Sequence, residues 1–380
     1  MQNKKFFCYE IYKNLAIWSH NGQLSYNPCS FFNGYIKTTD TYNHNEIWNG
    51  PEHQHLKNLV EQDKPIDGCR TCYHAEEHGL PSRRQGSKQF YEIFIQDTQL
   101  DLLAPQSIDY SVGSLCNLKC VICGPQNSTA WASDYQILHP HKKLDLIKHE
   151  KLNQIEIDDP VLLNNLKNIH FHGGGEPLLS KNHVNLLKRV KKLKGLSDLH
   201  IHYNTNGTKI VDSEILELWA ECNLVELYFS IDDVGERFNY QRTGADWEQV
   251  NKNLQWFYEN MPNNHMFKIN CTWSYLNIYY LNELVDWWQN NFQYNRLGDP
   301  TDLIFQKAMG ECEVRYLSVQ TKQKLLDKFV DYPALLDVVI SISESDNSHC
   351  EFLTFINNLD KIRNTESTKV FGDFIKLLNR

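Results

Sequence analysis

Between about residues 105 and 316, strand-like runs alternate with amphipathic helical patterns, and this alternation constrains the fold most strongly. Strands that alternate with helices predict a parallel sheet, either open or curved into a partial barrel. In such α/β folds the chemistry lies at the carboxyl ends of the strands. The predicted strands cover 107–113, 168–173, 199–206, 224–232 and 266–274, and the predicted helices include 182–194, 213–222 and 246–260.

The composition and the pattern of the sequence differ on either side of this segment. Residues 1–100 are rich in aromatic and turn-forming residues, with short predicted strands at 15–19 and 35–39 and a helix at 53–62. After about residue 317 the pattern is helical to residue 380. We therefore predict three parts: a small cysteine-rich α+β domain at 1–100, an α/β core at 105–316 and a helical extension at 317–380.

Composition excludes several classes of function. The net charge of −9 argues against broad binding to nucleic acids or anionic membranes. No apolar stretch approaches the length that spans a bilayer, and Glu10 and Lys13 interrupt any signal-peptide core. We expect a cytoplasmic protein, in which the eleven cysteines are metal ligands or buried small apolar residues rather than disulfides.

Three cysteines directly follow the first predicted core strand. Cys116, Cys120 and Cys123 form a C-x3-C-x2-C run, which is one thiolate short of a closed tetrahedral site. Three thiolates suit a [4Fe–4S] cluster that keeps one iron open to an external ligand. They also suit a zinc ion completed by a distant histidine or cysteine, so these residues alone leave both possibilities open.

Polar and glycine residues follow the next three predicted strands in order. "GGGEP" ends the second strand, where glycines allow close approach of the backbone and Glu176 can accept from an ammonium group. "NTNGT" ends the third strand with amides and hydroxyls, and "SIDD" ends the fourth with Ser230. Arg242 follows soon after as a partner for a carboxylate.

In this order the motifs resemble those of the radical S-adenosylmethionine (SAM) enzymes. "CNLKCVIC" is similar to their cluster motif, "GGGEP" to their GGEP motif, and "NTNGT" and "SIDD" with the later arginine to further SAM contacts. The resemblance implies a partial (β/α)6 radical SAM barrel whose [4Fe–4S] cluster is held by Cys116, Cys120 and Cys123. It also implies that SAM contacts Gly174, Gly175, Glu176, Asn204 or Asn206, Ser230 and Arg242. Gly173 departs from the family pattern, in which Thr or Ser is commoner at this position.

Four further cysteines lie in the N-terminal part: Cys8, Cys29, Cys69 and Cys72. From cysteine arithmetic alone a zinc site and an iron–sulfur cluster are about equally favoured. The segment that ends in "CRTCYHAEEHGLPSRR" resembles the twitch domain of a radical SAM subgroup, with matches at Glu76, Gly79, Ser82 and Arg84. That resemblance implies a second, auxiliary iron–sulfur cluster on these four cysteines, with Cys8 as its fourth ligand.

Two other cysteines and four histidines are candidates for roles near a substrate. Cys271 and Cys312 lie on or after predicted strands. One hypothesis is that either thiol reaches a barrel interior and donates a hydrogen atom, and the alternative is a buried free cysteine. The histidines alternate on two neighbouring predicted strands, so each pair shares a sheet face as a polar lining or as hydrogen-bonded core residues. They are His170, His172, His200 and His202.

The resemblance implies an enzyme that reductively cleaves SAM to a 5′-deoxyadenosyl radical, which then abstracts hydrogen from a substrate. We expect a small-molecule or carbohydrate-like substrate and a low-potential electron donor such as flavodoxin or ferredoxin. Peptide maturation is the alternative among enzymes. The alternative from a different class is a non-catalytic protein that binds zinc or an iron–sulfur cluster.

Overall fold

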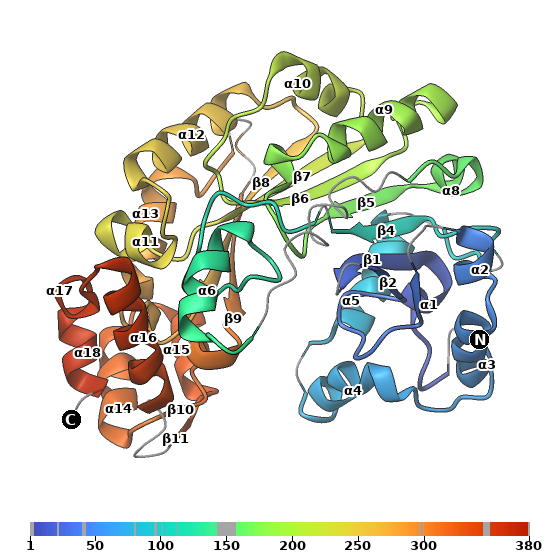
Figure 1. Ribbon diagram of the computed structural model, residues 1–380. Coiled ribbons are helices and arrows are strands. Elements are labelled where there is room, and N and C mark those ends of the chain that lie inside the picture. The colour runs from blue at the N-terminus through green and yellow to red at the C-terminus, as the bar shows by residue number, and fades with distance from the viewer. Residues whose placement is uncertain are drawn as a thin grey trace.

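The computed structural model describes residues 4–20, 23–39, 43–79, 81–94, 97–100, 102–111, 113–142, 157–295, 298, 300–344 and 350–378. Its main feature is a nine-stranded sheet in the order β3-β2-β1-β4-β5-β6-β7-β8-β9 (Figure 1). The six strands from β4 to β9 all run parallel and in sequence order. The predicted α/β class with a parallel sheet is therefore confirmed, whereas closure into a partial barrel stays a prediction.

The core consists of strands, each followed by one or more helices. Its strands are β4 (Ser107–Tyr110), β5 (Asn168–Phe171), β6 (His200–Thr205), β7 (Leu224–Ser230), β8 (His265–Trp273) and β9 (Asp302–Lys307). Its helices are α6 (Ala132–Leu138), α8 (Pro160–Asn165), α9 (Asn182–Lys194), α10 (Ser213–Ala220), α11 (Gly235–Gln241), α12 (Trp247–Asn260) and α13 (Leu281–Asn291). Short 3-10 turns are η3 (Thr129–Trp131), η4 (Pro177–Leu179), η5 (Ile278–Tyr280) and η6 (Gly310–Cys312). Five of these strands fall where the periodicity predicts them.

Alternation along the strands gives the sheet two unlike faces. Ile169, Phe171, Ile201 and Tyr203 are fully buried in one continuous apolar core. Their neighbours on the same strands, such as His170, point to the opposite face because successive side chains alternate. Helices α8 to α13 run around the outer side of the curved sheet in Figure 1. The apolar face thus packs against helices, and the polar face is left to the inside of the curve.

The N-terminal part shares the core sheet. It contains α1 (Tyr9–Lys13), β1 (Asn14–His20), β2 (Gln23–Asn27), β3 (Lys37–Thr39), α2 (His44–Trp48), α3 (Pro51–Glu61), η1 (Asp67–Cys69), α4 (Arg70–Glu77), α5 (Arg83–Gln89) and the π-helical η2 (Phe90–Phe94). Strand β1 pairs parallel with β4, and β2 and β3 continue the sheet antiparallel. The predicted helix at 53–62 and the strands at 15–19 and 35–39 correspond to α3, β1 and β3. The division into three domains stays a prediction.

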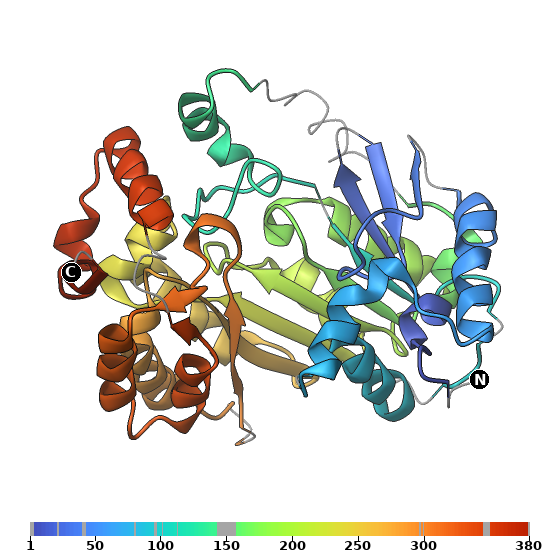
Figure 2. The ribbon, with the colours of Figure 1, turned by 90° about the horizontal axis from the view of Figure 1, so that it is seen from below.

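The C-terminal part is almost entirely helical, as its pattern predicts. Its helices are α14 (Val319–Lys328), α15 (Pro333–Ile340), α16 (Cys350–Arg363), α17 (Ser367–Val370) and α18 (Gly372–Leu378). The strands β10 (Tyr316–Leu317) and β11 (Ser343–Glu344) form a separate small sheet, which the sequence does not reveal. Figure 2 shows these helices gathered at the opposite end of the molecule from the N-terminal part. Among the described residues, no helix has both the length and the apolarity to cross a bilayer.

A buried ion pair fastens the last part of the chain to the core. Arg363 at the end of α16 donates from Nε to Asp134 Oδ2 at 2.7 Å, and both side chains are 3% exposed. Asp134 also accepts from Lys119 at 2.9 Å. Burial alone raises the pKa of Asp134, but the bonds from Lys119 and Arg363 outweigh it and lower that pKa overall. The carboxylate is therefore ionised in the folded protein.

We predict that Arg363→Ala lowers the free energy of unfolding by about 3 kcal/mol, because it leaves the Asp134 charge buried with one partner fewer. The folded pKa of Asp134 is depressed, so the stabilisation is present above the ordinary aspartate pKa of about 3.9 and is lost as the pH falls below it. Denaturant unfolding at neutral and acidic pH measures both effects. Arg315→Ala, which removes an exposed partner of Glu313, is the control and should change nothing measurable. Equal losses for both variants would contradict the prediction.

Candidate functional site

The three cysteines predicted to hold a cluster lie on one long loop after β4, residues 113–131, which we call the cysteine loop. Cys120 is buried, whereas Cys116 and Cys123 are partly exposed. Burial and, to a lesser extent, the neighbouring thiols Cys123 and Cys116 raise the pKa of Cys120 to about 12, and Arg242 opposes this shift. The three sulfurs are therefore close enough to interact electrostatically. Each would need a positive partner, such as a metal, to become a thiolate here.

Donors from other elements point at these sulfurs. The Leu118 amide lies 3.4 Å from Cys116 Sγ, and the Asn206 amide nitrogen Nδ2 lies 3.8 Å from it. Arg242 Nη1 lies 3.9 Å from Cys120 Sγ. Such donors stabilise sulfur that carries negative charge. The surroundings of the loop thus suit thiolate ligands.

One cavity of about 370 Å³ lies between the cysteine loop and the carboxyl ends of the strands. All ten residues predicted for the cluster and for SAM line it. They are Cys116, Cys120, Cys123, Gly174, Gly175, Glu176, Asn204, Asn206, Ser230 and Arg242. Thr272 and Gln306 extend the lining to β8 and β9. The structure brings the predicted residues together, while the ligand that each one contacts stays a prediction.

The glycine turn after β5 packs directly on the cysteine loop. Gly175 has a φ of +71°, and a Cβ atom there would lie 2.7 Å from the Gly113 carbonyl oxygen. The Gly175 amide donates to Asn127 at 2.8 Å, and the Glu176 amide donates to Leu115 at 2.7 Å. Only glycine tolerates both this conformation and this contact. The motif therefore sets the position of the loop as well as lining the cavity.

A different steric contact accounts for the glycine at position 173. Its φ is +95°, and a Cβ atom would lie 2.3 Å from Cζ3 of Trp18 on β1. The indole ring also makes an edge contact with His172, with 5.4 Å between the ring centroids. Trp18 thus fills the space that the Thr or Ser commoner at this position would need. The departure from the family pattern is explained by packing against the N-terminal part of the chain.

The Glu176 side chain serves partly as a structural link. Its carboxylate accepts from the Leu178 amide at 3.1 Å, from Thr205 Oγ1 at 2.8 Å and from the Asn206 amide at 2.7 Å. Burial raises its pKa, and these hydrogen bonds oppose that shift. Two carboxylate oxygens offer about four acceptor positions, so one position remains for a ligand donor. Glu176 therefore joins the ends of β5 and β6 beside the cavity.

Arg242 follows α11 and is 7% exposed. Its Nη2 lies 2.8 Å from Asp232 Oδ2, and Asp232 also accepts from the Thr272 amide at 2.8 Å. Burial acts to lower the Arg242 pKa, but Asp232 and Cys120 raise it overall. Its Nε is buried and has no hydrogen-bond partner among the described residues. This donor fits a ligand carboxylate, which is the role that the sequence predicts for Arg242.

Asn206, Asn204 and Ser230 complete the predicted set. Asn206 Nδ2 donates to Asn117 Oδ1 at 3.0 Å, so this side chain braces the cysteine loop. Asn204 Oδ1 bonds to His202 Nε2 at 3.1 Å. Ser230 ends β7 at the edge of the cavity. These side chains come from neighbouring strands, as the order of the motifs predicts.

The four N-terminal cysteines also converge. Cys8 precedes α1, Cys29 follows β2, Cys69 ends η1 and Cys72 lies in α4. Burial, then Glu10 and Cys69, raises the pKa of Cys8, while burial and Cys72 raise that of Cys69 to about 12. Burial, Glu10 and Cys8 raise the pKa of Cys29. Electrostatic interactions thus link Cys29 to Cys8, Cys8 to Cys69 and Cys69 to Cys72, and joint metal binding by these thiols stays a prediction.

The twitch-like motif residues brace this group. Ser82 Oγ donates to Glu76 Oε1 at 2.5 Å, and Arg84 Nε donates to the same oxygen at 3.0 Å. Arg84 Nη1 also donates to the Phe7 carbonyl at 3.2 Å, next to Cys8. The network therefore fixes the chain around Cys8, the cysteine whose assignment has the weakest sequence signal.

Cys271 and Cys312 are not among the described residues that line either of the two cavities on the polar side of the sheet. Cys271 is fully buried on β8, where alternation puts it with Ile269 and Trp273 on the face that packs against the helices. Asn277 Nδ2 lies 3.8 Å from its sulfur. Cys312 is 2% exposed in the turn η6. Their role as hydrogen-atom donors stays a prediction without structural support.

A polar row crosses the inner face of the sheet, and the sequence reveals only part of it. Register places Asp109, His170, His202 and Glu226 side by side on β4 to β7. His170 Nδ1 lies 2.9 Å from Asp109, and His200 Nε2 lies 2.9 Å from Glu226. The sequence leaves open whether the histidines form a polar lining or are hydrogen-bonded core residues. His170 and His202 do both, because they are hydrogen-bonded and also line a second cavity.

This second cavity has a volume of about 260 Å³ and extends from the row to the N-terminal part. Glu10, Arg83, Phe90 and Tyr91 line its N-terminal side. Arg83 Nε donates to Glu10 at 2.9 Å, and its Nη2 lies 3.4 Å from Asp109. Sequence reasoning missed all of these residues. The signal that could have indicated a polar site on this face is the presence of the charged residues Asp109 and Glu226 within otherwise apolar strand patterns.

Comparison with known proteins agrees with the motifs. Residues 110–276 match the family model of the Radical SAM superfamily. The match supports a Radical SAM superfamily domain over this segment, and members of that superfamily are enzymes that bind a [4Fe–4S] cluster and SAM.

Two curated relatives illustrate the similarity. A GTP 3',8-cyclase from Alkaliphilus metalliredigens is 28% identical over 154 residues, which cover 40% of this chain and 43% of that protein. A tungsten-containing aldehyde ferredoxin oxidoreductase cofactor-modifying protein from Pyrococcus furiosus is 31% identical over 121 residues, covering 32% of this chain and 29% of that one. The matched segment thus spans less than half the length of either relative.

Solved structures that match part of the chain include two that contain SAM. One is anSMEcpe with bound AdoMet, with a TM-score of 0.40, 19% identity and 63% of each chain covered. The other is Streptococcus suis SuiB bound to S-adenosylmethionine, with a TM-score of 0.37, 14% identity and coverage of 77% of this chain and 61% of that one. TM-scores of this size do not indicate detailed structural agreement.

We predict that Gly173→Ser lowers the thermal unfolding midpoint more than Gly195→Ser does. Both positions have positive φ, +95° and +82°, so both variants carry strain of about 1–2 kcal/mol. Only at Gly173 would the new side chain displace a ring, because no atom lies within 4 Å of a Cβ at Gly195. Adding Trp18→Ala to Gly173→Ser should cost less than the sum of the two single changes. Strict additivity, measured by thermal unfolding, would show that Trp18 is not the cause.

Proposed function

We propose that this chain is a radical SAM enzyme that acts on a small-molecule or carbohydrate-like substrate. Cys116, Cys120 and Cys123 would hold a [4Fe–4S] cluster, and SAM would bind beside it. When bound, this pair supplies a 5′-deoxyadenosyl radical that abstracts hydrogen from an unactivated C–H bond. The observation that carries the proposal is the convergence of all ten predicted residues on one cavity.

The residues of the cavity fit these groups. Three thiols leave a fourth coordination position open for SAM. The buried Nε of Arg242 lacks a partner among the described residues and suits the SAM carboxylate. The backbone at Gly174 and Gly175 and the remaining acceptor position of Glu176 suit the amino group. Asn204, Asn206 and Ser230 would then lie toward the ribose.

The relatives favour a small substrate over a peptide. The names of the two curated relatives refer to a nucleotide and to a cofactor. The second cavity, at about 260 Å³, is small and partly ionic, which suits a compact polar molecule better than an extended chain. The reaction also needs a one-electron reductant, and we propose a low-potential flavodoxin or ferredoxin for that role.

We further propose that Cys8, Cys29, Cys69 and Cys72 hold a second iron–sulfur cluster. Burial and, to a lesser extent, neighbouring thiols raise the pKa of Cys8, Cys29 and Cys69, and four thiolates complete a cluster without an open position. Ser82 and Arg84 donate to Glu76, and Arg84 also donates to the Phe7 carbonyl, which holds the chain next to Cys8. This cluster would accept an electron from a product radical or anchor the substrate.

The main test is SAM cleavage by anaerobically reconstituted protein with a chemical reductant. We expect 5′-deoxyadenosine and methionine from the wild type, measured by liquid chromatography, and none from Cys120→Ala, because that variant lacks an iron ligand. Cys222→Ala removes a buried thiol away from both cysteine groups and should retain cleavage. Full cleavage by Cys120→Ala would refute the proposal, as would an inert wild type that contains the brown cluster.

The second test concerns the N-terminal cysteines. We expect about eight irons per chain in the wild type and about four in the double variant Cys69→Ala/Cys72→Ala, because each [4Fe–4S] cluster holds four. SAM cleavage should persist in the double variant, since the cysteine loop is intact. A wild type with about four irons and one zinc, the zinc being lost in the double variant, would replace the auxiliary cluster by a zinc site. Metal analysis of both proteins separates these outcomes.

A further inference from the structure

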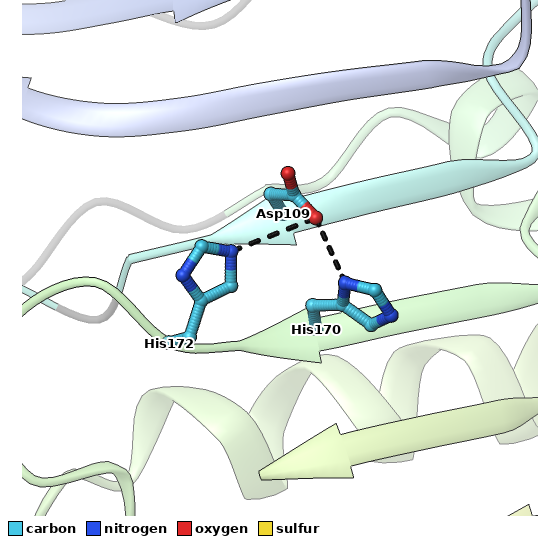
Figure 3. Close-up of side chains that lie close together, drawn as sticks. All are labelled: Asp109, His170 and His172. Carbon is cyan, nitrogen blue, oxygen red and sulfur yellow. Dashed lines mark hydrogen bonds and ion pairs between the residues drawn. The ribbon is translucent and has the colours of Figure 1, made fainter. Parts of the chain in front are cut away.

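Three potential metal ligands meet on the inner face of the sheet, outside both cysteine groups. Asp109 comes from β4, His170 from β5, and His172 from the residues directly after β5 (Figure 3). One ligand atom from each lies within 4.8 Å of the other two. Figure 3 shows both imidazole rings turned toward the same carboxylate. The group lies between the two cavities, because His172 lines the first and His170 lines the second.

The distances suit a shared ion. His170 Nδ1 lies 2.9 Å from Asp109 Oδ1, and His172 Nε2 lies 3.6 Å from the same oxygen. Two ligands bound to one metal at about 2.1 Å are roughly 3.0 Å apart at a right angle and 3.4 Å apart at a tetrahedral angle. The two observed distances lie close to this range, so small side-chain movements would complete the coordination.

The surroundings of Asp109 already orient it as a ligand. Its Oδ2 accepts from Asn14 Nδ2 at 3.3 Å and from the Ser30 amide at 3.2 Å. These bonds leave Oδ1 directed at the two histidines. Outer partners that fix a carboxylate in this way are typical of metal sites.

His172 has an unused nitrogen. Its Nε2 is buried and has no hydrogen-bond partner among the described residues, because the 3.6 Å separation from Asp109 is too long for one. A buried nitrogen without a partner is unfavourable, because nothing replaces the hydrogen bond that it makes with water in the unfolded chain. A bound ion would remove that cost, and a neutral imidazole is the form that binds metals.

Arg83 is the main argument against a cation at this position. Its Nη2 lies 3.4 Å from both oxygens of Asp109. However, the same guanidinium donates to Glu10 at 2.9 Å, and Glu10 is itself 4% exposed. Two carboxylates therefore share one guanidinium, and Arg83 bonds more closely to Glu10 than to Asp109, which leaves Asp109 Oδ1 available to a divalent ion. The competing account is a hydrogen-bonded Asp–His network with no ion.

We propose that Asp109, His170 and His172 form a site for a divalent transition metal. Two imidazoles and one carboxylate are typical ligands for ions such as Fe²⁺, Co²⁺, Ni²⁺ or Zn²⁺. Three protein ligands leave positions open toward the cavities, where water or an oxygen or nitrogen atom of a small molecule can bind. The site does not depend on the cysteines and goes beyond the proposed radical function.

Cobalt is the probe that tests the site. Protein reconstituted with its iron–sulfur clusters is dialysed anaerobically against Co²⁺, so that the cluster thiolates are already occupied. We expect one equivalent of cobalt per chain, with d–d absorption bands and without the intense charge-transfer band of sulfur ligands. His172→Gln and His170→Gln should each lose this equivalent while keeping the iron content of the wild type.

His200→Gln is the matched control, since it removes a buried histidine bonded to Glu226 on the neighbouring strand. It should retain the cobalt. The proposal is overturned if wild type and His172→Gln bind equal cobalt, or if the bound cobalt shows sulfur charge transfer. The readout is metal content, so an inactive enzyme that still binds cobalt at the histidines would refute the proposed function and leave the metal site standing.

Discussion

The cysteine loop depends on backbone hydrogen bonds from segments that are remote in the sequence. The Val121 amide donates to the Gln241 carbonyl at 2.7 Å, and the Glu176 amide donates to the Leu115 carbonyl at 2.7 Å. The loop has almost no regular structure of its own, so its polar backbone groups must find such partners. Its shape is therefore a property of the assembled sheet. The ligand geometry therefore requires the folded core.

The assembled sheet also explains why polar residues cluster on its inner face. Alternation along a strand gives every second side chain to the inner face, where Arg83 of α5 contacts Asp109 and the Phe90 ring packs near His170. Charged groups there are largely withdrawn from water and must be paired. Glu226 bonds to Lys268 at 2.9 Å and to His200, and these partners lower its pKa against the opposing effect of burial. Polar function on this face is possible because each charge has a nearby counter-charge.

Much of the core and of the candidate site could be predicted from the sequence, for a physical reason. Strand and helix periods are local, and parallel topology brings the ends of successive strands to one edge. The glycines and Glu176 could be assigned because they directly follow a strand. Asp109, Glu10 and Arg83 could not, since their partners are fixed by strand register and by contacts between distant segments. The pairing of β1 with the core sheet was unpredictable for the same reason, because the sequence of a short strand does not specify the strand with which it pairs.

Asp109 connects these levels of organisation. Ser30, which donates its amide to Asp109, directly follows Cys29 in the N-terminal cysteine group. On the other side His170 bonds to Asp109 and lies three residues before the glycine turn. Burial alone would raise the pKa of Asp109, but Arg83 and the histidines hold that pKa well below the usual range. This ionised carboxylate thus contacts both the chain that carries Cys29 and the strand that leads to the first cavity. Because β1 and β4 are also hydrogen-bonded to each other, the separation of the two cysteine groups is set by the rigid sheet and not by a linker.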